Sequence, residues 1–491
     1  MRLTILTRAS DLARLQGHLV ADRLRQTWPS AAITLTVRES AGDRDGETPL
    51  WQMGDKGAFT SDLSHALATG GADIVVHSWK DLPIEPRRDT VVAATLPRED
   101  ARDVLIVRRE AAGSRAPRLK VLSSSPRRAL MLGEILPALL PWDVDAVAFA
   151  DVRGNVPTRI RQLAGGQGDA LVVAKAALDR LLDPASPFTE AARSIRTALD
   201  ACDWMVLPLR DLPSAAAQGA LALEVAASNT ALAADLRSIS DADTWRAVQK
   251  EREILAGHGG GCHQAIGASV MSLPFGVVTS VRGRTDAGSE LSTWALDAYA
   301  PAQPTPAPGA IWPRPEERGG VTRRPLDVPD PLDGRALYVT RDEALPASWA
   351  VAPDRFVWAA GPSTWRKLAA RGVWVHGSSE GLGTFDPRTI DRLAGRQVRW
   401  HRLTHTRADV PDAFATYESE SAVPAVLRDR THFFWRSASE FRRAIAAFPD
   451  VRDRWHACGP GHTLDVVERL AGAARVRPYL TYEDWLNGMT S

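Results

Sequence analysis

Short apolar runs that are typical of strands alternate with helix-spaced leucines from the start of the chain. The run Leu3–Thr7 is followed by Ser10, a residue type that favours a helix N-cap, and then by apolar residues at helical spacing. Strands that alternate with helices predict an α/β fold with parallel or mixed sheets. Further strand-like runs lie at Ile33–Val37, Ile74–Val76, Val104–Val107 and Ala170–Val173.

A proline-rich stretch divides the chain. Prolines at 301, 304, 306, 308, 313 and 315 predict an extended linker over residues 301–333. The 491 residues are enough for several domains. We therefore expect a multidomain unit before the linker and a separate module, residues 334–491, after it.

Composition argues against several classes of protein. Lys and Arg number 60 against 59 Asp and Glu, so the net charge of +1 provides no overall field for nucleic acid. Three cysteines cannot build a disulfide framework, and no CxxC spacing indicates a zinc site. The first residues lack the apolar core of a signal peptide, and no apolar stretch approaches the ~20 residues that cross a bilayer. We expect a cytoplasmic protein with no metal and no membrane or nucleic-acid partner.

One cysteine has unusual surroundings. Cys262 lies in Gly259-Gly-Gly-Cys-His-Gln-Ala-Ile-Gly267, where three glycines leave room for a bulky group beside the thiol. Taken alone, such a cysteine is more often a buried or loop residue without a role. Cationic segments elsewhere in the chain change this interpretation.

Three segments place cations on loops that follow expected strands. Lys80 and Asp81 come after Ile74–Val76, at the strand end where α/β proteins bind ligands, although a surface turn closed by Pro83 is the preferred explanation for this short motif taken alone. Ser123–Arg128 leads into a helix and presents hydroxyls, backbone N–H groups and two guanidiniums. Such a helix start binds anions, or it is simply a cap with solvated arginines.

The third segment, Asp151–Arg159, contains a glycine turn between its arginines. Arg153 and Arg159 are expected to point toward one region, where Arg8 and Lys56 add further positive charge. Several cations on loops suit a ligand with many carboxylates better than a single phosphate.

In their order along the chain, these segments resemble hydroxymethylbilane synthase, also called porphobilinogen deaminase. The resemblance covers roughly residues 2–298. Nine motifs carry it: Thr7–Ser10; Gly42–Asp43 with Thr48–Leu50; Asp55–Phe59; Ala72–Pro83; Arg98–Asp100; Ser124–Arg128; Arg153–Asn155; Gln218–Gly219; and Gly260–Cys262.

The resemblance implies a three-domain α/β transferase. Domain 1 would span 1–99 and 210–238 and domain 2 would span 100–209, both like periplasmic-binding-protein lobes. A small α+β domain, 239–300, would carry Cys262, joined by a thioether to a dipyrromethane cofactor that is never released. The implied reaction adds four porphobilinogens head to tail with loss of ammonia, in tetrapyrrole (haem) synthesis. We expect a monomer.

The resemblance also implies roles for single residues. Asp81 and Lys80 would be catalytic, with the carboxylate holding a pyrrole N–H and stabilising positive charge. The chain departs from the family at Trp79 (usually Met), Ala217 (Gly) and Ala265 (Pro). The Trp79 ring adds bulk beside Asp81, but no charged group is lost and activity should survive. Implied cofactor contacts are Cys262, Lys56, Asp81, Ser125, Arg127, Arg128 and Arg153; implied substrate contacts are Arg8, Arg153, Arg159 and Gln218.

The module after the linker contains two similar segments, which suggest an internal repeat. Val357–Thr364 and Trp455–Thr463 each read as a strand, a Gly-Pro turn and a helix, although a Gly-Pro helix start is common by itself. With Leu337–Arg341, Phe433–Ser439 and Tyr417, they resemble uroporphyrinogen-III synthase. That resemblance implies two Rossmann-like lobes around a linear tetrapyrrole, with Tyr417 assisting loss of a hydroxyl, and hence a bifunctional enzyme with a second, lyase activity.

About fifteen residues separate Arg341 from the first Gly-Pro unit, fewer than the family has. We therefore expect a shortened first lobe whose share of the interlobe cleft is missing. Two alternatives stay open for the module: it cyclises hydroxymethylbilane to uroporphyrinogen III, or it is a degenerate domain that stabilises the enzyme or binds a partner. A third, non-catalytic alternative is a two-lobed anion-binding protein, which has no need for Asp81 and Cys262 together.

Overall fold

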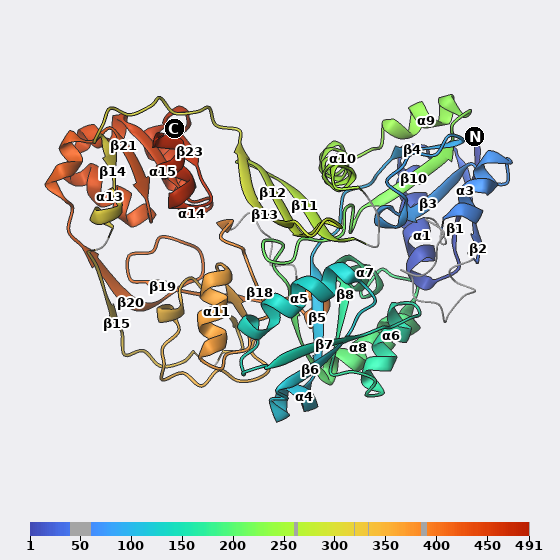
Figure 1. Cartoon of the computed structure of the whole chain (residues 1–491), viewed down its shortest axis with the longest axis horizontal. Coiled ribbons are helices and arrows are strands. Elements are labelled where there is room, and N and C mark those ends of the chain that lie inside the picture. Colours follow the sequence, from blue (N-terminus) through green and yellow to red (C-terminus); the bar gives the residue numbers. More distant parts are fainter. Residues whose placement is uncertain (40–59, 260–263, 319, 332, 384–389, 491) are drawn as a thin grey trace.

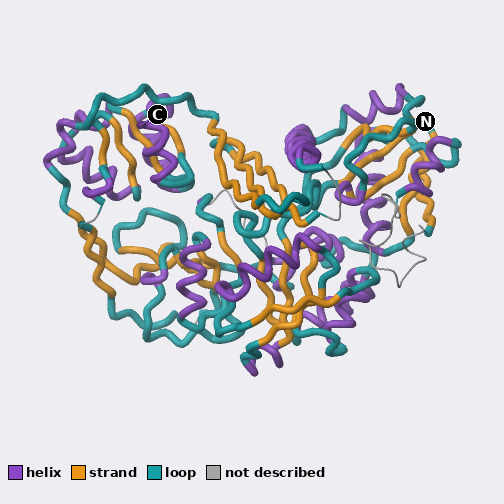
Figure 2. The backbone as a smooth tube through the Cα atoms, viewed as in Figure 1, coloured by secondary structure: helices purple, strands orange, loops and turns teal. Residues whose placement is uncertain are grey.

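The computed structural model describes residues 1–39, 60–259, 264–318, 320–331, 333–383 and 390–490. The chain forms four α/β lobes and one three-stranded sheet, with its two termini at opposite ends of the long axis (Figure 1). Helices lie beside the strands in every lobe (Figure 2). The expected α/β fold with several sheets is confirmed.

Lobe 1 has a five-stranded mixed sheet. In sheet order the strands are β2 (Ala32–Arg38), β1 (Arg2–Arg8), β3 (Ile74–Ser78), β10 (Leu221–Ala226) and β4 (Thr90–Ala94), and the helices are α1 (Asp11–Thr27), α3 (Ser61–Ala68) and α9 (Thr230–Arg237). Strand β10 comes from much later in the chain and runs antiparallel to both of its neighbours. As predicted, Ser10 caps helix α1, its side chain accepting from the Ala13 N–H.

Lobe 2 is a second five-stranded mixed sheet. Its strands in sheet order are β7 (Ala146–Ala150), β6 (Arg118–Leu122), β8 (Ala170–Ala174), β5 (Asp103–Arg108) and β9 (Cys202–Val206). Its helices are α4 (Arg109–Ser114), α5 (Pro126–Leu139), α6 (Val156–Ala164), α7 (Lys175–Leu181) and α8 (Thr189–Asp200). The five apolar runs of the sequence coincide with β1, β2, β3, β5 and β8, so those strand predictions are confirmed.

Two segments connect these lobes. The first crossing segment, residues 95–102, leads from β4 into β5, and the second, residues 207–220, returns from β9 to β10. Helix α10 (Ala242–Gly257) then packs on an antiparallel sheet of β11 (Ala265–Leu273), β12 (Gly276–Arg284) and β13 (Glu290–Ala298). Residues 260–263, with Cys262, lie between these elements and outside the described residues.

The C-terminal module consists of lobes 3 and 4. Lobe 3 orders its six strands as β15 (Val321–Pro325), β20 (Ala413–Ser421), β19 (Trp400–His405), β16 (Ala336–Val339), β17 (Val357–Ala359) and β18 (Gly377–Ser378), with α11 (Pro362–Ala370) and α12 (Asp391–Ala394). Lobe 4 is a parallel sheet of β14 (Ile311–Trp312), β21 (His432–Trp435), β22 (Trp455–Cys458) and β23 (Val476–Pro478), with α13 (Ala438–Ala447), α14 (His462–Ala471) and α15 (Tyr482–Thr490). Both Gly-Pro units have the predicted strand, turn and helix.

Part of the predicted linker belongs to these sheets, which corrects the boundary at 334. Strand β14 pairs with β21, and β15 pairs antiparallel with β20. The Trp312 ring is buried 5.3 Å from that of Trp435. The prolines correctly indicated extended backbone, but pairing with strands much later in the chain leaves no local signal.

Lobe 2 and lobe 3 share their hydrophobic core. Two continuous clusters of buried residues contain side chains from both lobes. The Trp142 and Trp374 rings stack at 6.2 Å, and the Trp374 indole N–H donates to the Trp204 carbonyl at 3.0 Å. Edge strands β9 and β18 meet where Val206 N–H donates to the His376 carbonyl at 2.8 Å. The C-terminal module is thus packed onto the first half of the chain through its interior.

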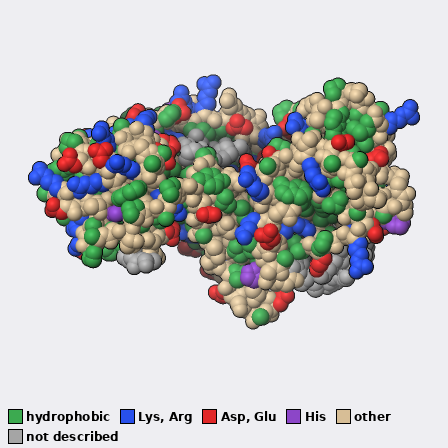
Figure 3. Space-filling model, turned by 90° about the horizontal axis from the view of Figure 1, so that it is seen from above, with side chains coloured by type: hydrophobic (Ala, Val, Ile, Leu, Met, Phe, Trp, Pro, Cys, Tyr) green, Lys and Arg blue, Asp and Glu red, His purple; other side chains and the backbone are tan. Residues whose placement is uncertain are grey.

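The surface in Figure 3 carries Lys and Arg side chains interspersed with Asp and Glu, in keeping with the near-zero net charge. In the described part of the chain, no helix combines the length and the apolar character needed to cross a membrane.

Candidate functional site

A buried carboxylate organises the site between lobes 1 and 2. Asp103, the first residue of β5, is 1% exposed and pairs with Arg128 at 2.6 Å and with Arg127 at 2.8 Å. Burial alone would raise the pKa of Asp103, but the Arg128 and Arg127 guanidiniums hold it well below its usual range. Asp103 therefore remains charged and fixes both arginines.

Helix α5 brings these arginines to Asp103. Ser125 caps the helix, its hydroxyl accepting from the Arg128 N–H at 3.4 Å, and Pro126 occupies the first turn. This cap and this proline start the helix directly after β6, so Arg127 and Arg128 lie in the first turn. Arg127 also donates to the Pro213 carbonyl at 2.7 Å. The two terminal nitrogens of the Arg127 guanidinium are therefore both held, one by Pro213 and the other by Asp103.

Gln218, in the second crossing segment, joins the two lobes. Its amide N–H donates to Asp103 at 2.8 Å and to the Ala101 carbonyl at 2.7 Å, while its amide oxygen accepts from Lys80 of lobe 1 at 3.3 Å. Burial lowers the pKa of Lys80; Asp81 opposes this effect and Arg128 reinforces it. Lys80 and Asp81 form a short 3-10 turn directly after β3, as their position after the strand predicted.

Arg159 lies within electrostatic reach of Asp81 and of three other arginines, Arg128, Arg153 and Arg8. Arg159 follows the N-cap Asn155 of α6, and its Nε donates to the Gly154 carbonyl at 2.8 Å. Burial, then Arg128, then Arg153 lower the pKa of Arg159 to about 10; Asp81 opposes this and Arg8 adds to it. The arginines thus repel one another in a partly buried region, which favours a ligand with several carboxylates.

The structure therefore brings most of the predicted site residues together. Lobe 1 supplies Arg8, Lys80 and Asp81, lobe 2 supplies Ser125, Arg127, Arg128, Arg153 and Arg159, and the crossing segment supplies Gln218. Lys56 and Cys262 lie outside the described residues.

Sequence reasoning missed Asp103 and a second buried anchor, Glu251. Glu251 takes a bidentate pair from Arg98 at 2.7 and 3.0 Å and accepts the Ala217 N–H at 2.7 Å. The motif Arg98–Asp100 marked this region, and Asp103 stands just beyond it. Burial of a carboxylate, however, has no signature in sequence.

Two departures from the family pattern have structural outcomes. The Trp79 ring is 1% exposed and lies in an apolar cluster 5.2 Å from the Trp245 ring, so its bulk is accommodated by the core. Ala217 has φ +65°, a left-handed conformation that glycine adopts more easily. That geometry explains why a glycine is usual at this position.

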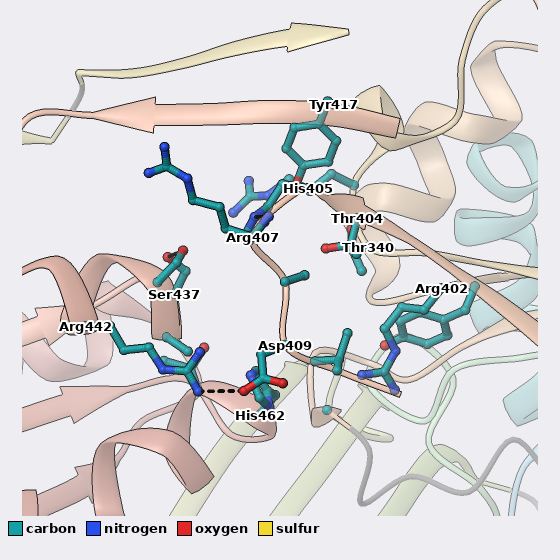
Figure 4. A pocket seen from close by; sticks show the side chains of 18 residues that line it. Thr340, Arg402, Thr404, His405, Arg407, Asp409, Tyr417, Ser437, Arg442 and His462 are labelled. Carbon is teal, nitrogen blue, oxygen red and sulfur yellow. Dashed lines mark hydrogen bonds and ion pairs between the residues drawn. The ribbon is translucent and has the colours of Figure 1, made fainter. Parts of the chain in front are cut away.

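A second candidate site is a cavity of about 220 Å³ between lobes 3 and 4 (Figure 4). Lobe 3 provides most of its lining, contrary to the expectation that its share of the cleft is missing. Tyr417, Thr340–Arg341 and Ser437–Ser439, singled out from the sequence, all line it. The remaining lining residues are Tyr338, Gly383, Arg402, Thr404, His405, Arg407, Ala408, Asp409, Val410, Arg442, His462 and Thr463.

The cavity is cationic but contains neutral hydrogen-bonding groups. Burial raises the pKa of Tyr417, against the influence of Arg341. Burial also lowers the pKa of His405, and Arg443 and Arg341 add to this effect. Arg442 pairs with Asp409 at 3.0 Å, as the dashed line in Figure 4 marks. Within the described ranges, no group of three or more His, Cys, Asp or Glu side chains suits a metal.

Comparison with known proteins bears on the first half of the chain. A family model described as "Porphobilinogen deaminase, dipyromethane cofactor binding domain" matches residues 3–234. The chain is 35% identical over 271 residues to porphobilinogen deaminase of Lachnospira eligens, covering 55% of this chain and 84% of that protein. It is 35% identical over 267 residues to the Thiobacillus denitrificans protein of that name, with coverages of 54% and 79%. For the Mycolicibacterium gilvum protein, identity is 37% over 265 residues, with coverages of 53% and 76%.

Proposed function

Because the chain belongs to the porphobilinogen deaminase family, we propose that it is a hydroxymethylbilane synthase, a transferase that joins four porphobilinogens head to tail. Its residues 3–234 match that family's dipyrromethane cofactor-binding domain. The observation that carries the proposal is that Gln218 links Lys80 of lobe 1, the neighbour of Asp81, to the Asp103–Arg128 group of lobe 2.

In each addition, the C–N bond of the substrate aminomethyl group breaks and ammonia leaves. The carbon that remains bonds to the free α-carbon of the growing chain, which then loses its proton. Positive charge develops on the substrate pyrrole as ammonia departs. In this proposal the Asp81 carboxylate holds the pyrrole N–H and stabilises that charge, while Lys80 donates to anionic groups beside it.

The residues present suit a dipyrromethane, whose side chains are carboxylates. Burial, and after it repulsion from Arg128 and Arg153, lower the pKa of Arg159, and bound carboxylates would offset both effects. We assign the cofactor to Ser125, Arg127, Arg128, Arg153 and Asp81, with Asp103 holding both Arg127 and Arg128. When bound, the group supplies the primer for chain growth. Lys56 as a contact and Cys262 as the thioether anchor complete the assignment, and both lie outside the described residues. Arg8, Arg159 and Gln218 are assigned to the incoming substrate.

Intact-mass measurement combined with turnover tests this proposal. The purified chain should carry the added mass of a dipyrromethane and consume porphobilinogen with release of ammonia. Cys262→Ser should lose the added mass, whereas Cys202→Ser, at a buried cysteine remote from this loop in sequence, should keep it. A chain that turns over porphobilinogen without any added mass contradicts the assignment of Cys262.

We propose a second, lyase activity for the C-terminal module: cyclisation of hydroxymethylbilane to uroporphyrinogen III. Supporting it are the cavity between lobes 3 and 4, its arginines, and Tyr417, which lines the cavity and has a pKa raised by burial. In this proposal the neutral Tyr417 hydroxyl protonates the departing hydroxyl. The alternative is a module that only stabilises the deaminase. Tyr417→Phe decides between them: isomer III should give way to isomer I while porphobilinogen consumption is unchanged. Isomer I from the unaltered chain would reject the second activity.

A further inference from the structure

The second crossing segment lies between the deaminase site and lobe 3. At Arg210, its backbone N–H donates to the Glu380 carboxylate at 2.7 Å. Glu380 belongs to lobe 3, two residues after β18, and is only 4% exposed. A buried carboxylate from the C-terminal module therefore holds the backbone of a segment that enters the site.

The same segment holds Arg127 three residues later. The Pro213 carbonyl accepts from Arg127 at 2.7 Å, and Arg127 in turn pairs with Asp103. Between these two contacts the chain forms a tight turn, in which the Asp211 and Leu212 N–H groups both donate to the Pro208 carbonyl. Because this turn is short and hydrogen-bonded, displacement at Arg210 carries over to Pro213 and to the Arg127 guanidinium.

Glu380 is itself fixed in an unusual backbone conformation. Its φ is +55°, a left-handed value that costs a residue with a side chain energy and persists only where the surroundings impose it. The neighbouring Ser379 and Gly381 N–H groups donate to Ala359 and Ala360 carbonyls at 2.9 Å, which ties the segment to β17. The carboxylate is therefore presented to Arg210 from a rigid support.

We infer that Glu380 is a positioning residue for bilane synthesis, contributed by the C-terminal module. Glu380 holds the Arg210 N–H, and the Pro213 carbonyl of the same segment holds Arg127. Arg127 in turn pairs with Asp103, which Gln218 links to Lys80. This inference rests on the proposed deaminase activity, and it gives lobe 3 a role in the first reaction that is independent of any second activity.

Steady-state kinetics with porphobilinogen test it on the full-length, cofactor-loaded chain. Glu380→Ala and Glu380→Gly both remove the acceptor and should raise KM about tenfold, the loss expected for one charge-assisted hydrogen bond. Glu380→Gly also relieves the left-handed strain, so agreement between the two variants separates the hydrogen bond from strain. Glu380→Gln keeps an acceptor oxygen and should restore KM to within about threefold of the unaltered chain.

Trp374→Phe is the matched control. It removes one hydrogen bond of the lobe 2–lobe 3 interface, from the indole to the Trp204 carbonyl, which lies in β9 and not in the crossing segment. It should lower thermal stability and leave KM unchanged. Wild-type KM in Glu380→Ala, or a rise in KM in Trp374→Phe equal to that in Glu380→Ala, overturns the inference.

Hydrogen exchange supplies a readout independent of turnover. Peptides covering 207–214 and the start of α5 should exchange faster in Glu380→Ala than in Trp374→Phe. Equal exchange in both variants contradicts the positioning role even if the chain were inactive. Failure of the unaltered chain to consume porphobilinogen would instead contradict the proposed function.

Discussion

Lys80 of lobe 1 and Asp103 of lobe 2 are linked by a single amide, that of Gln218, which accepts from the lysine and donates to the carboxylate. Among the described residues, the lysine and the carboxylate make no direct hydrogen bond or ion pair with each other. One neutral side chain thus connects the two lobes at the site.

Gln218→Leu should therefore impair both catalysis and folding. It leaves part of the hydrogen-bonding capacity of Asp103 and Lys80 unsatisfied, which costs about 1–3 kcal/mol of unfolding free energy. We expect kcat/KM for porphobilinogen to fall at least about tenfold, since 1.4 kcal/mol is a factor of ten. Urea unfolding and initial rates measure the two effects. Gln218→Glu retains the acceptor for Lys80 but places a carboxylate against Asp103, so its kcat/KM should be no higher than that of Gln218→Leu. Near-wild-type rates in Gln218→Leu would contradict the linking role of Gln218.

Ala217→Gly should stabilise the protein. Ala217 has φ +65°, and a left-handed conformation costs an alanine roughly 1 kcal/mol more than a glycine. The gain is offset in part by the lost methyl group, so we expect an increase of up to about 1 kcal/mol in unfolding free energy, measured by thermal or urea unfolding. Ala222→Gly, in the ordinary strand β10, is the control and should destabilise. A destabilised Ala217→Gly would show that methyl packing outweighs strain.

Lobe 4 should lose stability as pH falls below 6.5. His456 is fully buried, accepts from the Trp435 indole at Nδ1 at 3.0 Å, and has a pKa lowered by burial from 6.5 to about 4. Between pH 6.5 and 4 the unfolded imidazole binds more protons than the folded one. The stabilisation is therefore complete above pH 6.5 and is lost as pH falls through this window, by at most about 3 kcal/mol.

Hydrogen exchange of 455–458 at pH 7.5 and pH 5 measures this loss. His456→Gln removes the titrating group while keeping an acceptor for Trp435, so its exchange should respond less to pH. The same pH dependence in both proteins would exclude His456 as the cause.

Gly383→Ala should disturb the cavity between lobes 3 and 4. A Cβ atom on Gly383 would lie 2.4 Å from the Cα of Gly461 in lobe 4, closer than real contacts allow. The lobes would have to separate there, and we expect the fraction of isomer III to fall. Gly372→Ala is matched, because Gly372 has φ +79° against +74° for Gly383 but nothing within 4 Å. An isomer ratio altered equally in both variants would point to backbone strain instead of the contact.

The sequence alone located strands and site residues because their signals are local. Apolar runs such as Ile74–Val76 and caps such as Ser10 depend on neighbours within one or two turns, and the structure contains them. Lys80 and Asp81 could be placed because α/β proteins gather functional residues at strand ends.

The contacts that complete the site are not local. Asp103 is identified only by its burial against α5, and Glu380 reaches Arg210 across 170 positions of sequence. Strand β15 likewise pairs with a strand far along the chain: Val321 pairs with Ser421, 100 positions later, and Pro325 with Tyr417, 92 positions later. Spacing within one segment carries no information on such pairs.

The meeting of β9 with β18 has a consequence for the gene. A chain that stopped after the three-stranded sheet would expose the edge of β9 together with Trp142 and Trp204, the kind of bare apolar edge that promotes aggregation. Loss of the C-terminal module by a premature stop codon is therefore expected to abolish the proposed bilane synthesis as well. The first half of the chain is thus expected to depend on the second half for its solubility.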